Sequence, residues 1–259
     1  MLDVHGSTAV VTGASSGIGA EFAEQLARRG ADLVLVARRE DRLRALAARL
    51  AAEHGVGVRV VAADLAGPAG RQTLLDALAG TDVDVLINNA GFATHGAFAE
   101  LDPQRVHDEI AVNVVAVTML TRALLPGMLA RDRGAIVNIA STAAFQPIAH
   151  MAVYGATKAF VLSFTEALWG ETERGGVDVV AVCPGATDTE FFDVAGESAS
   201  VGSRQTPAQV VETALGALDR RSTPPSVVSG AANRWASRLP RILPRRTTIR
   251  VTRNLVAPK

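Results

Sequence analysis

The chain alternates short apolar runs with segments whose apolar residues have helical spacing, and this alternation constrains the fold more than any other feature. The apolar runs lie at 8–11, 32–36, 58–62, 83–87, 135–139 and 177–182. Strands and helices in this order favour parallel strand pairs joined by right-handed helical crossovers. We therefore predict an α/β fold with a doubly wound parallel sheet and helices on both faces.

Length and composition fit one globular domain. A chain of 259 residues is long enough for a single α/β core, and 48% hydrophobic with 20% charged residues is typical of globular proteins. No apolar run reaches the length of a membrane span, and the N-terminus lacks a basic leader, so we expect a cytoplasmic protein. We assign residues 1–230 to the domain and 231–259 to a basic, proline-containing extension.

A glycine-rich turn follows the first apolar run and opens a helical segment. Glycines in this position allow a tight turn and a close approach of the backbone to a pyrophosphate, which the free N–H groups of the helix then bind. This context predicts a Rossmann-like dinucleotide site. The residues that we expect to contact the cofactor here are Gly13, Ser15, Ser16, Gly17, Ile18 and Gly19.

Tyr154 and Lys158 lie four residues apart in a helical segment, so their side chains share one helix face. A nearby ammonium favours phenolate and lowers the pKa of a tyrosine from about 10 toward the operating pH. Ser141 follows the apolar run 135–139, at the sheet edge where open α/β sheets bind ligands. These three residues predict an acid–base site.

Three further segments match a known family. The sequence reads Asn-Asn-Ala-Gly over residues 88–91, and Pro184-Gly185 follows the sixth apolar run with threonines at 187 and 189. Asn113 stands 28 residues before Ser141. With these segments and the spacing Gly-x3-Gly-x-Gly, the chain resembles the short-chain dehydrogenase/reductase (SDR) family in its single-domain form, over residues 6 to 230.

This resemblance implies an oxidoreductase that transfers hydride between a nicotinamide and a carbonyl or secondary alcohol. Tyr154 would exchange the proton, Ser141 would orient the oxygen, and Lys158 would lower the Tyr154 pKa and hold the nicotinamide ribose. The backbone at Asn113 would hold a water that links Lys158 to solvent. The further cofactor contacts that the resemblance implies are Asp64, Leu65, Asn89, Ala90, Gly91, Tyr154, Lys158, Pro184, Gly185, Thr187 and Thr189.

The end of the second apolar run favours NADP(H) over NAD(H). An NAD site places a carboxylate there, whereas this chain has Arg38 and Arg39, and a guanidinium matches a 2′-phosphate. Ser15 and Arg39 are the expected helpers of Arg38. The alternative is that both arginines only begin a solvated helix.

Apolar residues around these motifs indicate a mainly apolar small-molecule substrate: Phe92, Phe145, Ile148, Met151, Phe191 and Phe192. The segment 188–206 is either a loop that closes on substrate or an ordinary surface loop. We interpret His95 and His150 as loop or packing residues. No His or Cys cluster has metal-ligand spacing, so we predict no metal, and we expect no nucleic-acid partner.

Helical segments at 103–129 and 152–169 begin with capping signals or periodic apolar residues. In the SDR family these two helices commonly pack against a second copy, so the resemblance implies a homodimer or homotetramer. A protein that keeps the fold but has lost catalysis is the alternative function, and the retained Asn113, Ser141, Tyr154 and Lys158 argue against it.

The charge of the chain is unevenly distributed. The net charge is zero, yet no acidic residue follows Asp219, while ten basic residues do. The first 219 residues therefore carry an excess of ten acidic residues. A basic tail with interleaved apolar residues predicts either docking on the acidic body, which we favour, or contact with an anionic membrane surface that also supplies lipid-linked or acyl substrates.

Overall fold

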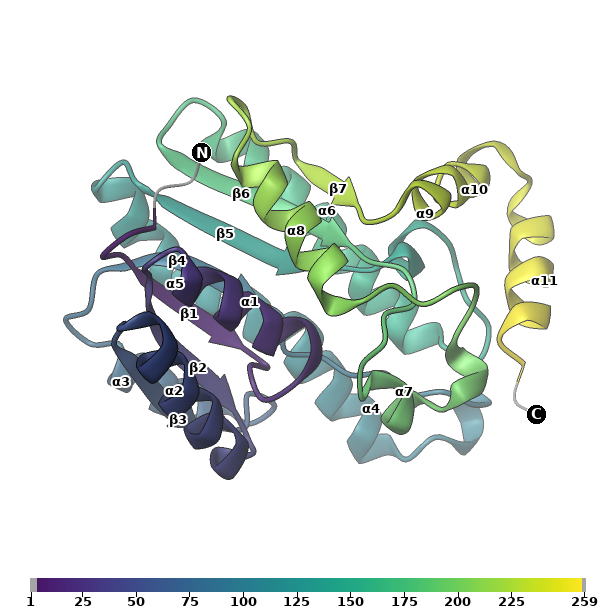
Figure 1. Cartoon of the computed structure of the whole chain (residues 1–259). Coiled ribbons are helices and arrows are strands. Elements are labelled where there is room, and N and C mark those ends of the chain that lie inside the picture. Colours follow the sequence, from purple (N-terminus) through teal and green to yellow (C-terminus); the bar gives the residue numbers. More distant parts are fainter. Residues whose placement is uncertain (1–3, 258–259) are drawn as a thin grey trace.

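A parallel sheet of seven strands forms the centre of the molecule (Figure 1). The computed structural model describes residues 4–257, so Lys259, the last charge of the predicted tail, lies outside the described residues. The strand order is β3-β2-β1-β4-β5-β6-β7, and every pair is parallel. The strands are β1 (Thr8–Thr12), β2 (Asp32–Ala37), β3 (Val58–Ala62), β4 (Val83–Asn88), β5 (Gly134–Ile139), β6 (Val177–Cys183) and β7 (Ser226–Val228).

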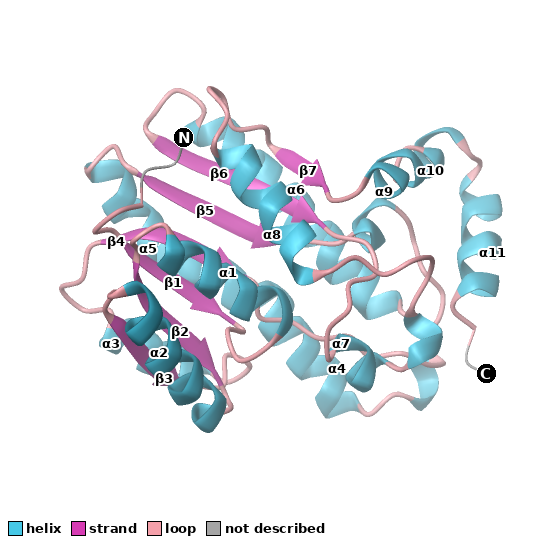
Figure 2. Cartoon of the chain, in the orientation of Figure 1, coloured by secondary structure: helices cyan, strands magenta, loops and turns pink. Residues whose placement is uncertain are grey.

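Helices cover both faces of the sheet, as the alternation predicts (Figures 1 and 2). One face packs against α1 (Gly17–Arg28), α2 (Glu40–His54) and α8 (Pro207–Leu218). The other face packs against α3 (Pro68–Ala77), α5 (Val117–Ala130) and α6 (Ala152–Thr172). The doubly wound α/β fold is thereby confirmed.

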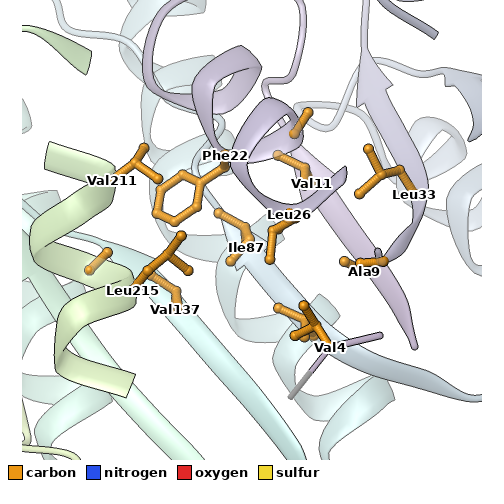
Figure 3. Packing of buried hydrophobic residues seen from close by; sticks show 14 of the residues in the cluster. Val4, Ala9, Val11, Phe22, Leu26, Leu33, Ile87, Val137, Val211 and Leu215 are labelled. Carbon is orange, nitrogen blue, oxygen red and sulfur yellow. The ribbon is translucent and has the colours of Figure 1, made fainter. Parts of the chain in front are cut away.

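Alternate residues of the central strands point to opposite faces of the sheet, and both sets are buried. This explains why both faces need a layer of helices. In β1, Ala9 and Val11 pack into the cluster under α1 and α8, while Val10 packs into the opposite cluster. On the first side, Phe22 and Leu26 of α1 contact this core and are fully buried (Figure 3). Apolar residues on both faces of a strand are typical of parallel sheets covered by helices.

The long helix predicted from residue 103 runs from Pro103 to Ala130. Asp102 caps it by accepting a hydrogen bond from the Gln104 N–H at 2.8 Å, with Pro103 in the first turn. It consists of α4 (Pro103–Ile110), a π-helical turn (Ala111–Ala116) and α5, and the sequence did not predict the π turn. By length and composition alone this stretch is also apolar enough to cross a membrane, but α5 packs against the sheet.

Two regions differ from the sequence prediction. Strand β7 extends the sheet by one strand, and three residues are too few to carry a detectable period. Beyond it, the chain forms three short helices, α9 (Ala231–Ala236), α10 (Leu239–Ile242) and α11 (Arg245–Leu255). Pro244 precedes α11 and ends the preceding turn, in line with the expectation that prolines exclude one continuous helix. The segment 188–206 contains α7 (Phe191–Ala195). Short 3-10 turns lie at Phe98–Glu100, Thr142–Phe145 and Glu197–Ala199.

The strand order changes direction between β1 and β4, because β2 and β3 lie on one side of β1 and the later strands on the other. One buried hydroxyl links the ends of β1 and β4. Thr12 Oγ1 accepts hydrogen bonds from the N–H groups of Asn89 at 2.9 Å and Ala90 at 3.0 Å. It donates to the Ile87 carbonyl at 3.1 Å. Open α/β sheets bind ligands at such a switch point, so Thr12 fixes the edge on which a site would be built.

Replacing Thr12 with valine keeps the shape of the side chain but leaves buried backbone groups unpaired. Each such group costs about 1–3 kcal/mol, so we expect Thr12→Val to lower the free energy of unfolding by about 2–4 kcal/mol. Urea denaturation measures this loss. Thr8→Val, at the other end of the same strand, is the matched control and should cost less than about 1 kcal/mol. Equal losses in the two variants would contradict the role assigned to Thr12.

Candidate active site

The glycine-rich turn adopts backbone angles that only glycine tolerates easily. Gly13 and Gly17 have φ of +67° and +56°. A Cβ on Gly19 would collide with the Gly13 carbonyl oxygen and the Asn89 amide, because these segments are packed together. The turn is also held by the Asn89 amide, whose Nδ2 donates to the Thr12 carbonyl at 2.9 Å.

Helix α1 begins at Gly17, and no side chain caps its first turn. Its initial N–H groups are therefore available to an anion, as the dinucleotide prediction requires. Ser16, at the N-cap, accepts a hydrogen bond from Arg39 Nη2 at 2.9 Å. A pyrophosphate would fit this cradle by chemistry and by space.

The two arginines that follow β2 are in different environments. Arg39 donates to Ser15 Oγ at 2.9 Å and pairs with Glu190 at 2.7 Å. Hydrogen bonds from Arg42 and then Arg39 lower the pKa of the Glu190 carboxyl to about 2. Arg38 is exposed, lines the cavity, and has no ion pair within residues 4–257. Arg39 is thus already engaged, and Arg38 is the guanidinium open to a ligand.

Helix α6 and strand β5 bring the predicted acid–base residues together. Tyr154 and Lys158 lie one turn apart on α6, and the ammonium is 5.8 Å from the centroid of the phenol ring. Ser141 follows β5, accepts from the Ala143 N–H at 3.1 Å, and hydrogen bonds the Tyr154 hydroxyl. Lys158 is buried and donates to the Ile139 carbonyl at 2.7 Å.

Burial dominates the electrostatics of this group. It raises the pKa of Tyr154 to about 12, against a smaller lowering by the Ser141 hydrogen bond. Burial also lowers the pKa of Lys158 to about 8. The expectation of a Tyr154 pKa lowered from about 10 is therefore wrong for this structure, because removing the phenolate from water raises the pKa more than the Ser141 hydrogen bond lowers it.

Asn113 lies in the π-helical turn, where such irregularities often mark functional sites. Its Nδ2 donates to the Phe92 carbonyl at 3.0 Å and to Thr157 Oγ1 at 3.1 Å. Its Oδ1 accepts from the Phe92 N–H at 3.2 Å. The side chain thereby ties the loop after β4 to helix α6, beside Lys158.

Nearly all predicted site residues line one cavity of about 750 Å³. Gly19 and Asn113 do not line it and instead support its walls. Phe145 does not line it either and packs into a core cluster with Val161 and Leu162. The predicted residues that do line the cavity are Gly13, Ser15, Ser16, Gly17, Ile18, Arg38, Arg39, Asp64, Leu65, Asn89, Ala90, Gly91, Ser141, Tyr154, Lys158, Pro184, Gly185, Thr187 and Thr189.

The cavity has an apolar end that the sequence only partly indicated. Phe92, Ile148, Met151, Phe191 and Phe192 line it as expected. The C-terminal helices contribute a wall that was not predicted, because an extension beyond the last strand gives no sign of where it folds back. Its apolar members are Ala236, Leu239, Pro240, Leu243, Val251, Leu255 and Val256.

Glu109 was also missed by sequence reasoning. Its side chain is fully buried on α4, one turn before Asn113. Oε2 accepts from the N–H and Oγ1 of Thr94 at 3.0 and 2.6 Å, while Oε1 has no hydrogen-bond partner in the part of the chain that the structure describes. Burial raises the pKa of this carboxyl, and its charge acts on both Lys158 and Tyr154. A glutamate in a polar helical segment gives no signal of such burial.

One cluster of ligand-type side chains lies away from the cavity. Glu24, Glu53 and His54 bring three such atoms within 4.8 Å of one another. Arg49 pairs with Glu24 at 2.6 Å and with Glu53 at 2.9 Å. Arg49 thus already engages both carboxylates that a metal ion would require.

Comparison with known proteins identifies the family. The sequence matches the short chain dehydrogenase family over residues 7–199. It is 35% identical to the very-long-chain 3-oxoacyl-CoA reductase of Phaeosphaeria nodorum, over 90% of this chain and 69% of that protein. It is 36% identical to the Bos taurus protein of the same name, over 69% of this chain and 59% of that protein.

Solved structures agree in fold. A short-chain dehydrogenase from Sphingobium yanoikuyae in complex with NADPH gives a TM-score of 0.82 at 42% identity, over 89% of this chain and 91% of that one. A 7beta-hydroxysteroid dehydrogenase gives 0.87 at 28% identity, over 96% and 97%. A Burkholderia phymatum protein of this family in complex with NAD gives 0.82 at 29%, over 100% and 99%. The chain belongs to the short-chain dehydrogenase/reductase family and is an oxidoreductase of that family.

Tyr154 is the only tyrosine of the chain, so its titration can be followed directly. We expect the folded chain without cofactor to show no phenolate absorbance at pH 10, whereas the urea-unfolded chain should titrate near pH 10. The folded pKa is raised to about 12. The neutral phenol therefore stabilises the fold fully below about pH 10, and this contribution is lost as the pH rises toward 12. A folded chain that titrates at or below pH 10 would contradict the dominance of burial.

Proposed function

We propose that this chain is an NADP(H)-dependent oxidoreductase that interconverts a carbonyl and a secondary alcohol on a mainly apolar small molecule. The observation that carries the proposal is the meeting of Ser141, Tyr154 and Lys158 in one cavity with an unpaired Arg38. Acid–base side chains occupy its middle, apolar side chains one end, and a phosphate cradle the other. This order of regions along the cavity suits a substrate carbonyl that lies next to the nicotinamide ring.

The cofactor fits the residues present. Gly13 to Gly19 and the open first turn of α1 would hold the pyrophosphate, and Arg38 would bind a 2′-phosphate in bidentate fashion. When bound, the nicotinamide supplies or accepts the hydride, and the protein supplies position and protons. Relatives with NADPH and with NAD both exist, so the preference depends on the residues that follow β2.

The chain's own residues divide the remaining work. Ser141 would donate to the substrate oxygen and hold it beside Tyr154, whose hydroxyl gives it a proton during reduction. A phenol with a raised pKa is fully protonated at neutral pH, which suits it as the acid of the reductive direction. Lys158 would hold the nicotinamide ribose and, in its cationic form, stabilise the phenolate that results.

Exposed apolar residues support the expectation of a second copy. Val115 in the π turn and Met119 in the first turn of α5 are 36% and 51% exposed, and Phe160 on α6 is 41% exposed. These helices contact each other within the chain through α4 and α6. A homodimer formed through them would cover this apolar surface, as in the family.

Removing the hydroxyl of Tyr154 tests the proposed chemistry. Tyr154→Phe should lower kcat for reduction of an apolar ketone by about 100-fold or more, while the Kd of NADPH changes less than about threefold. Steady-state kinetics and fluorescence titration of NADPH measure the two effects. A panel of ketones, aldehydes and acyl thioesters with the unchanged chain establishes the substrate class. Near-normal turnover by Tyr154→Phe would remove Tyr154 from the mechanism.

Arg38 tests the cofactor preference. Arg38→Ala should weaken NADPH binding by about 1.5–3 kcal/mol and leave NADH nearly unchanged, because only NADPH carries the 2′-phosphate. Adding Ala37→Asp should shift preference further toward NADH. Arg44→Ala is the matched control, since within residues 4–257 Arg44 pairs only with Glu40 on the same exposed helix face. Equal weakening of both cofactors by Arg38→Ala would show that Arg38 does not bind the phosphate.

A further inference from the structure

The C-terminal strap, which we define as residues 231–257, lies beyond the β7 edge of the sheet (Figure 1). Its residues line the apolar end of the cavity. Thr252 Oγ1 donates to the Pro147 carbonyl at 2.9 Å, and a ring nitrogen of His95 hydrogen bonds the Val256 carbonyl at 2.7 Å. Asn233 Nδ2 donates to Gln205 Oε1 at 3.2 Å. The strap is therefore docked on its own domain at both ends.

Helix α11 turns two chemically different faces in opposite directions. Thr248, Val251 and Leu255 have i, i+3, i+7 spacing and line the cavity. Arg246, Arg250 and Arg253 follow a spacing of four and three and lie on the other side of the helix. The face toward the cavity thus carries uncharged threonine and apolar side chains, and the face away from it is basic.

The outer face of the strap has no internal charge partner. Arg246, Arg250 and Arg253 are all exposed and make no ion pair within residues 4–257. The chain has no acidic residue after Asp219, so no carboxylate of the strap can offset them. Docking of the strap therefore uses its inner face and leaves the arginines unneutralised.

Three large apolar side chains of the strap, Trp235, Ile242 and Ile249, are exposed and do not line the cavity. Trp235 on α9 is 70% exposed, and Ile242 on α10 is 78% exposed. Arg238 stacks over the Trp235 ring, with its guanidinium carbon 5.1 Å from the ring centroid. Exposed tryptophan and isoleucine beside unpaired arginines suit the boundary between lipid headgroups and acyl chains.

We propose that the outer face of the C-terminal strap binds an anionic membrane surface, so that bilayer-dissolved apolar substrates reach the cavity past the strap's inner face. The arginines pair with lipid phosphates, while Trp235 and Ile242 enter the interface. An acidic soluble protein would satisfy the arginines but would not explain exposed apolar side chains on α9 and α10. The substrate part of this proposal rests on the proposed function, whereas membrane binding does not.

Vesicle co-sedimentation of the full chain tests the surface. We expect binding to phosphatidylcholine vesicles that contain phosphatidylglycerol, little binding to pure phosphatidylcholine, and weakening by salt. The triple variant Arg246→Gln, Arg250→Gln, Arg253→Gln should bind about 100-fold more weakly, at about fivefold per arginine. These substitutions leave the cavity wall intact, which a truncation would not.

The control for charge alone is a second triple variant elsewhere on the surface. Arg174, Arg220 and Arg221 are also exposed and unpaired within the described chain. Changing these three to glutamine should alter vesicle binding less than about threefold, because they lie outside the strap. Equal losses in both triple variants, or no binding by the unchanged chain, would overturn the proposal.

Trp235 supplies a second readout. Its emission should shift to shorter wavelength on binding anionic vesicles, and Trp235→Phe should abolish the shift, since Trp169, the other tryptophan, packs against the core. A shift that persists in Trp235→Phe would contradict insertion of α9. Binding to an acidic protein without any vesicle binding would replace the membrane with a protein partner and would also overturn the proposal.

Turnover separates this inference from the proposed function. The triple strap variant should reduce a water-soluble ketone at the normal rate but lose about tenfold or more in the rate with a ketone dissolved in anionic vesicles. Unchanged vesicle-dependent turnover would refute delivery from the bilayer. If the unchanged chain turned over none of the substrates, the proposed function would be refuted. Co-sedimentation would still show whether the strap binds an anionic membrane surface.

Discussion

The Thr12 hydroxyl at the end of β1 is the interaction on which the arrangement of the site depends. It bonds the Ile87 carbonyl of β4 and the N–H groups of the two residues that follow this strand, so two strands far apart in sequence end at a fixed separation. The glycine-rich turn begins at the next residue and packs directly on this segment. The segment that Thr12 holds borders the phosphate cradle and continues into the loop that Asn113 binds. One contact between two strands therefore helps to position both the cofactor site and the acid–base residues.

Burial shapes the chemistry of the centre more strongly than pairwise charge. Tyr154 and Lys158 both have pKa values displaced toward their neutral forms, the first upward and the second downward. The geometry of an i, i+4 pair indicates contact but carries no information on how much water surrounds it. Glu109 adds a third buried ionisable group to the same region, and its charge opposes formation of phenolate. The polypeptide alone therefore favours tyrosine as a proton donor.

Sequence reasoning succeeded where a feature has a period or a fixed local spacing. The six long strands, the glycine turn before α1 and the Asp102–Pro103 helix start all follow from neighbours in sequence. It failed where the outcome depends on distant packing. Strand β7 is stabilised by pairing with β6 and has no pattern of its own. The cavity wall from α10 and α11 requires the chain to fold back across the sheet edge, and Arg39 is occupied by Glu190, 151 residues away.

The single cysteine of the chain ends β6, directly before the Pro184–Gly185 segment that borders the cavity. Cys183 is fully buried, and burial raises the pKa of its thiol to about 12. Alkylating reagents react with exposed thiolate, so the native chain is protected and only an opened sheet edge is labelled. The rate of thiol modification at a chosen pH therefore measures the free energy of opening beside the active site, with no introduced probe. A ligand that binds only the closed form would slow the modification by a factor set by the ligand concentration relative to its Kd.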